Sequence, residues 1–189
     1  MDEQALIVSA RTGNPHAFNA LVSAYQGVAY NVAYRVIGHP EAAADATQDA
    51  LLAAYRALPS FRGGSFRAWL LRIVTNVCYD RLRQNKRRPQ VSLDEMAEDL
   101  DYVPGLAADG ESPEDVVLRQ DVQRILEMAI AKLPFDQRVA VVLSDVEGLS
   151  YEEIAAATGA TVGTVKSRLS RARARLRDFL TQGREPLRP

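Results

Sequence analysis

Apolar positions recur at helical spacing through the first half of the chain. The first stripe consists of Phe18, Leu21, Val22, Tyr25, Ala29, Val32 and Val36. Steps of three, four and seven residues place these side chains on one face of a helix. Gly38 and Pro40 mark its end, and Pro40 followed by Glu41 suits the first turn of a second helix. This second helix should end before Pro59. Its apolar positions are Ala46, Ala50, Ala53 and Leu58.

A third helix is predicted after the loop at residues 60–65. Its inward stripe is Phe66, Trp69, Leu70, Ile73 and Val77. Trp69 shares this spacing, so it is interpreted as a core residue rather than as an exposed wedge. The loop contains Gly63 and Gly64 in succession, which gives it the freedom to wrap around a ligand. Strand patterns are absent, and the predicted class is all-α.

The second half begins with another amphipathic stripe. Its members are Val122, Ile125, Ala129, Ile130 and Leu133. Ser112 and Pro113 suit the start of this helix, and Pro134 breaks the chain after it. A further helix is predicted over 135–146.

Two short helices joined by a tight turn follow. Ser150 and Glu153 have the spacing of a capping box, which predicts a helix starting at Tyr151. Gly159 suits the left-handed residue that ends such a helix, and Thr161 is a competent N-cap for the next one. This punctuation predicts a helix-turn-helix.

The last helix has two chemically different faces. Its apolar face is Val165, Leu169, Ala172 and Leu176, and its polar face is Ser167, Ser170, Arg171 and Ala174 with Lys166 at the edge. Six cations and no acid lie between Lys166 and Arg177. A merely solvated face usually mixes both signs. The one-sided charge therefore favours binding to a polyanion.

The net charge of −1 conceals a strong segregation along the chain. Residues 1–90 have an excess of five cations, residues 91–115 have nine acids and no base, and residues 116–189 have an excess of three cations. We therefore predict two small helical domains, 1–90 and 116–189, joined by an acidic flexible linker at 91–115 that carries Pro and Gly. The linker is either a solvated spacer or a mimic of nucleic-acid charge.

Other function classes find little support in the composition. No apolar run approaches the length of a membrane span, and no signal-peptide pattern is present, so we expect a cytoplasmic protein without membrane insertion. Cys78 is the single cysteine, and His16 and His39 are the only imidazoles. Nothing has metal-ligand spacing, and no cofactor is expected.

Four motifs in this order resemble the sigma factors of bacterial RNA polymerase. The small extracytoplasmic-function type, which has only the second and fourth sigma domains, is the most similar class. The matching motifs are DATQDALLAAYRAL (45–58), FRGGSFRAWLLRIVTNVCYDRLR (61–83), LPFDQRVAVVL (133–143) and EGLSYEEIAAATGATVGTVKSRLSRARARL (147–176). Ala44 departs from the pattern, because the family commonly has Glu there.

The resemblance implies three partners. Core RNA polymerase would be bound through Asp45, Gln48 and Asp49, which in the family dock on the clamp helices of its largest subunit. Promoter DNA is the second partner. The third is an anti-sigma factor, which commonly holds members of this family inactive.

The resemblance also divides the promoter between the two domains. The first domain would melt the -10 element, with Phe61 and Asn76 in a pocket for a flipped base and with Arg72, Tyr79 and Arg83 along the strand. The last helix would lie in the major groove at the -35 element. Lys166, Ser167, Ser170 and Arg171 would read bases there, and Thr161, Arg168 and Arg173 would meet phosphates.

Two other classes remain as alternatives. A dimeric transcription regulator also carries a helix-turn-helix, but it would need a dimerisation or effector domain in residues 1–90. That region instead carries a glycine loop and a cation-rich helix. An enzyme is the third class, yet no phosphate-binding loop, nucleophile motif or zinc motif occurs, so the chain is expected not to be a catalyst.

Overall fold

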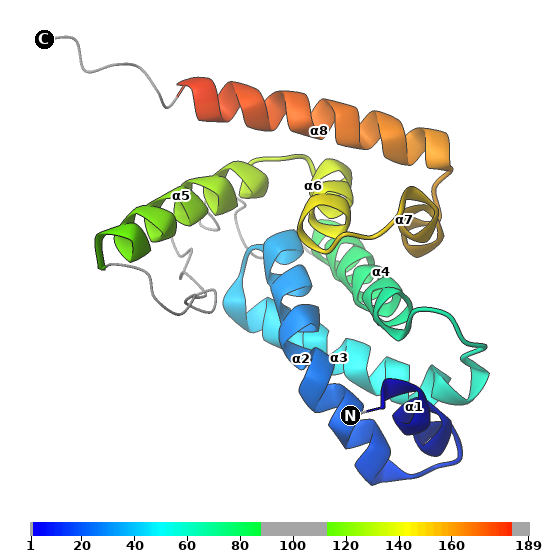
Figure 1. The fold of residues 1–189 in the computed structure, drawn as a ribbon. Helices are drawn as coiled ribbons and strands as arrows, with labels where there is room; N and C mark the ends of the chain where they lie inside the picture. The colour runs from blue at the N-terminus through cyan, green and yellow to red at the C-terminus, as the bar shows by residue number, and fades with distance from the viewer. Residues whose placement is uncertain (1, 88–112, 183–189) are drawn as a thin grey trace, which may run out of the picture.

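The computed structural model describes residues 2–87 and 113–182, which are helical apart from short turns (Figure 1). The elements are α1 (Glu3–Arg11), α2 (Pro15–Ile37), α3 (Pro40–Ala57), η1 (Leu58–Ser60), α4 (Phe66–Arg87), α5 (Pro113–Ala131), α6 (Phe135–Val141), η3 (Val142–Val146), α7 (Tyr151–Thr158) and α8 (Val162–Gln182). These residues contain no strand, in agreement with the predicted class. Residues 91–112 of the predicted linker lie outside the described residues.

The helix punctuation follows the predicted chemistry. Gly38 ends α2 and Pro40 begins α3. In the helix-turn-helix, the Ser150 hydroxyl accepts from the Glu153 amide at 3.2 Å, and the Glu153 carboxylate accepts from the Ser150 amide at 2.8 Å. Gly159 ends α7 with φ at 67°, a conformation that disfavours residues with a Cβ. The predicted capping box and left-handed cap are both confirmed.

Two features of the helices differ from the sequence prediction. The first is α1, which was not expected, although Asp2 caps it by accepting from the amides of Gln4 and Ala5. The second is the stretch expected as one helix over 135–146. It widens into a π-helical turn, η3, where the Glu147 amide donates to the Val142 carbonyl five residues back.

A buried apolar cluster joins the two halves of the chain. It contains Val32 and Val36 of α2, Val74 of α4, and residues of α6 to α8 such as Leu143 and Leu169. The helix α4 packs against α7, and α2 contacts α5, α6 and η3. A second cluster lies among α1, α2, α3 and the start of α4. The domains predicted as separate modules thus share a buried apolar cluster in this structure.

Cys78 belongs to the shared cluster and is 1% exposed. Burial raises the pKa of its thiol to about 12. Because the thiolate is the reactive species, we expect iodoacetamide to leave the folded protein unmodified near neutral pH and to alkylate Cys78 fully in concentrated urea. Mass spectrometry measures both. Equal alkylation rates in the folded and unfolded protein would contradict this prediction.

Candidate nucleic-acid and polymerase interface

The three residues predicted to dock on the polymerase project from one exposed face of α3. Asp45, Gln48 and Asp49 are all exposed. Arg81 of α4 reaches across to the two carboxylates. Its Nη2 lies 2.6 Å from an Asp49 oxygen, and its Nη1 lies 3.7 Å from an Asp45 oxygen. Arg81 therefore ties this acidic face to α4, a role that no local pattern in the sequence indicated.

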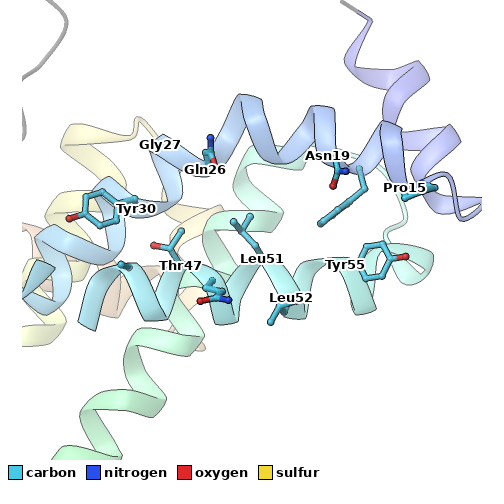
Figure 2. Close-up of a pocket in the computed structure, with 12 residues that line it drawn as sticks. Pro15, Asn19, Gln26, Gly27, Tyr30, Thr47, Leu51, Leu52 and Tyr55 are labelled. Atoms are coloured by element: carbon cyan, nitrogen blue, oxygen red, sulfur yellow. The ribbon is translucent and has the colours of Figure 1, made fainter. Parts of the chain in front are cut away.

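An apolar groove of about 680 Å³ lies beside this face, between α2 and α3 (Figure 2). Gln48 is among its lining residues. Leu51, Leu52 and Tyr55 line it from α3, and Tyr30 lines it from α2. Leu52 and Tyr55 are 48% and 47% exposed. The acidic face thus adjoins accessible apolar surface. Charged and apolar surface side by side suit contact with another macromolecule.

The residues predicted for the -10 element fall into two environments. Arg72, Asn76 and Arg83 are exposed on α4. Phe61 is only 3% exposed, because its ring packs against Phe66 and Trp69 with centroids 5.9 and 5.1 Å away. The structure therefore does not bring Phe61 to the surface with the others. Trp69 is half-buried in the same aromatic group, consistent with its interpretation as a core residue.

The loop before α4 depends on its two glycines. Gly63 and Gly64 have φ values of 96° and 89°, in the region that residues with a Cβ rarely adopt. Nothing lies within 4 Å of a Cβ built at either position. The glycines are therefore needed for the backbone conformation and not for close packing. Both of them are exposed.

Tyr79, the remaining -10 candidate, is half-buried against the other domain. Its hydroxyl donates to an Asp136 carboxylate oxygen at 2.9 Å, and its ring packs edge-on against Phe135 at 5.0 Å. Burial is the main cause that raises the pKa of the Tyr79 hydroxyl, and the hydrogen bond to Asp136 raises it further. The hydroxyl thus remains a proton donor.

The predicted buried and exposed faces of α8 are confirmed. Val165, Leu169, Ala172 and Leu176 are buried, whereas Lys166, Ser167, Ser170 and Arg171 are exposed. Thr161 is exposed at the start of α8, where its hydroxyl accepts from the Thr164 amide at 3.2 Å. The Arg171 guanidinium donates to the Ser167 hydroxyl at 3.1 Å, one turn earlier. The base-reading candidates therefore lie together on one open surface.

The two arginines predicted to contact phosphates each face an aspartate. Arg168 lies 3.0 Å from an Asp136 oxygen. Arg173 donates from Nε and Nη2 to the two oxygens of Asp145, at 3.0 and 2.7 Å. These hydrogen bonds lower the pKa of Asp145 and raise that of Arg173. Both guanidinium groups thus already have an anionic partner inside the chain.

Three further polar contacts join the two halves, and sequence analysis identified none of them. Arg67 of α4 donates to the carboxylate and the carbonyl of Glu147. Glu147 is buried, and burial raises the pKa of its carboxyl group. The positive charge of Arg67 acts in the opposite direction and lowers this pKa. Arg35 lies 2.7 Å from Glu127, and Arg138 donates to the Val36 carbonyl at 3.0 Å. The contacting residues are up to 102 positions apart, and therefore left no local signal.

Within residues 2–87 and 113–182, no helix is long and apolar enough to cross a membrane. Nor do three or more His, Cys, Asp or Glu side chains gather there in a way that could hold a metal ion.

The helices α7 and α8, joined by the turn at Gly159, form a helix-turn-helix whose second helix, α8, is cationic. This arrangement is the one found in helix-turn-helix DNA-binding proteins. Two family profiles identify the particular family: Sigma-70 region 2 matches residues 21–88, and Sigma-70, region 4 matches residues 123–176. The chain belongs to the sigma-70 family of RNA polymerase sigma factors. It functions as a sigma factor in promoter-specific transcription initiation.

Similar proteins cover most of the chain. The RNA polymerase sigma-H factor of Pseudomonas aeruginosa is 41% identical over 174 residues, which is 90% of each protein. The ECF sigma factor SigE of Mycolicibacterium smegmatis is 38% identical over 166 residues, 88% of this chain but 62% of that relative. Among solved structures, a sigma factor RpoE in complex with the anti-sigma factor NepR from Bartonella quintana has a TM-score of 0.65 at 29% identity, covering 87% of this chain and 96% of that one.

Proposed function

We propose that this sigma factor divides promoter recognition between α4, which contacts the -10 element, and α8, which reads the -35 element. The exposed polar face of α8, opposite a buried apolar stripe, is the observation that carries the proposal. A helix anchored in this way can enter a major groove without disturbing its own core. Arg72, Asn76 and Arg83 offer a second, separate polar surface on α4.

Docking on core RNA polymerase is assigned to α3. Asp45 and Asp49 provide negative charge, and the adjoining groove provides apolar area. A cationic helical surface with apolar side chains would complement both. The clamp helices of the largest polymerase subunit, which the family uses, are the proposed occupant.

The chain itself catalyses no reaction, because the polymerase performs nucleotidyl transfer and the sigma factor contributes binding energy that distorts DNA. Its place is the cytoplasm, where polymerase and promoters are found. An anti-sigma factor is the proposed regulator, supported by the complex in which the similar RpoE was solved.

Reconstituted transcription tests the proposed function directly. Purified chain and core polymerase are incubated with a library of random promoters, and transcripts are sequenced. We expect transcripts only when both proteins are present, and we expect their promoters to share two sequence elements. Strong specific DNA binding by the chain alone, without any transcript, would contradict the proposal and favour a conventional regulator.

Arg171→Ala is expected to weaken specific binding at the -35 element. A bidentate contact to a base contributes about 1–3 kcal/mol, which corresponds to roughly 5- to 150-fold in affinity. Binding of polymerase holoenzyme to a cognate promoter and to one with an altered -35 element measures the effect. Arg177→Ala, on an exposed position of the same helix, is the matched control. Equal discrimination by Arg171→Ala and wild type would remove Arg171 from the base-reading residues.

A further inference from the structure

The Arg171 side chain is held along the surface of α8 by two hydrogen bonds to a single residue. Its Nε donates to the Ser167 carbonyl at 3.2 Å, and its Nη2 donates to the Ser167 hydroxyl at 3.1 Å. Both residues are exposed. A long side chain on an open helix surface otherwise samples many rotamers, and ordering it on binding costs free energy. Ser167 therefore restricts Arg171 before any ligand is bound.

Ser167 is itself fixed by the preceding turn of the helix. Its hydroxyl donates to the Thr164 carbonyl at 2.9 Å, and the Thr164 hydroxyl lies 3.0 Å from that of Thr161. A hydroxyl has a single proton to donate, and its lone pairs accept. Because the Ser167 proton is used on Thr164, the capacity that remains is that of an acceptor, and Arg171 takes it up. Ser167 in this arrangement has no proton left for a base.

The two hydrogen bonds leave Arg171 oriented and still able to bind. A guanidinium has more N–H donors than the pair used on Ser167, and those that remain suffice for a bidentate contact to a base. Ser167 lies one turn toward the N-terminus of α8, and recognition helices contact base edges with their N-terminal residues. The groups that hold Arg171 are neutral, whereas Arg168 and Arg173 each face an aspartate.

We infer that Ser167 is a positioning residue for base recognition, which orients the Arg171 guanidinium toward the edges of the -35 bases and does not read a base itself. This inference rests on the proposed function of α8. A direct reader contacts DNA independently, whereas a positioning residue acts only through the side chain that it orients. Removing the Ser167 hydroxyl should therefore matter only while Arg171 is present.

A double-mutant cycle in the polymerase holoenzyme tests this dependence. Ser167→Ala, Arg171→Ala and the double variant are compared with wild type for discrimination between a cognate promoter and one with an altered -35 element. We expect Ser167→Ala to lower discrimination about fivefold in the wild-type background and less than about twofold in the Arg171→Ala background. Loss of helix stability would not explain this result, because Ala has a higher helix propensity than Ser.

Two further variants serve as controls for the cycle. Ser167→Thr keeps a hydroxyl that can bond to the carbonyl of the preceding turn, so it should retain discrimination within about twofold of wild type. Ser170→Ala removes a hydroxyl from the same exposed face. Residues one position apart do not face each other on a helix, so any effect of Ser170→Ala should be equally large with and without Arg171.

The mobility of the guanidinium provides a measurement without DNA. NMR relaxation of the Arg171 Nε–H group in the free full-length chain should give a lower order parameter in Ser167→Ala than in wild type. The exposed Arg177 on the same helix should be unchanged.

Three results would overturn the inference. The first is unchanged discrimination in Ser167→Ala, or a loss in Ser167→Thr as large as that in Ser167→Ala. The second is an equal loss for Ser167→Ala in both backgrounds, which is the behaviour of a direct reader. The third is an Arg171 order parameter that Ser167→Ala does not change. Failure of the proposed base reading is distinct, because Arg171→Ala alone would then leave discrimination unchanged, and the positioning role would fall with it.

Discussion

Asp49→Arg is expected to abolish stable association with core RNA polymerase. Asp49 is exposed on α3, and the proposed partner surface is cationic. Placing like charges opposite each other costs several kcal/mol, which amounts to a loss of about 100-fold or more in affinity. A pull-down with core polymerase at increasing concentrations measures the loss. Retention at wild-type levels would contradict the assignment of α3.

The ion pair with Arg81 makes a second control necessary for this experiment. Asp49→Arg also sets two guanidinium groups side by side, since Arg81 lies 2.6 Å from Asp49 in the wild type. The double variant Asp49→Arg with Arg81→Glu restores an internal ion pair of reversed polarity. If polymerase binding stays lost in the double variant, the loss arises from docking. Glu41→Arg, at an exposed position in the first turn of α3, controls for net charge.

Leu169→Ala is expected to lower the free energy of unfolding by about 2–5 kcal/mol. Leu169 is 1% exposed and belongs to the buried face of α8. The truncation leaves a cavity between α8 and the helices it packs against, α6 and α7. Urea unfolding followed by circular dichroism measures this change. The slope of the unfolding free energy against urea concentration should stay the same as in wild type.

The matched control for this variant is Arg175→Ala. Arg175 lies on the exposed side of the same helix, so its truncation should change the free energy of unfolding by less than about 0.5 kcal/mol. A loss below about 1 kcal/mol for Leu169→Ala would mean that the apolar stripe of α8 does not anchor this helix.

Local chemistry explains which parts of the fold were predictable from sequence. The Ser150–Glu153 box and Gly159 act within a few residues, so the boundaries of α7 could be derived from sequence. The buried and exposed faces of α8 follow from helical periodicity alone. The signals for α1 are also local, namely Asp2 as a cap and the apolar pair Ile7 and Ala10, but the apolar stripe that predicts a first helix begins only at Phe18 of α2.

Contacts between distant residues were beyond sequence reasoning. Asp136 carries no motif, and its partners Tyr79 and Arg168 lie 57 and 32 positions away. Phe61 illustrates the same limit. The family resemblance implied a place for this ring in a pocket for a flipped base, but packing against Phe66 and Trp69 buries it in this structure. Its role at a flipped base stays a prediction that requires the ring to leave this aromatic group.

The apolar cluster shared by the two domains constrains whatever separates them. Parting α4 from α7 would bring hydrophobic side chains such as Val74 and Ile154 nearer to water. A partner that holds α4 and α7 apart would have to cover that surface with apolar groups of its own. Formation of such a complex should then show a negative heat-capacity change in calorimetry.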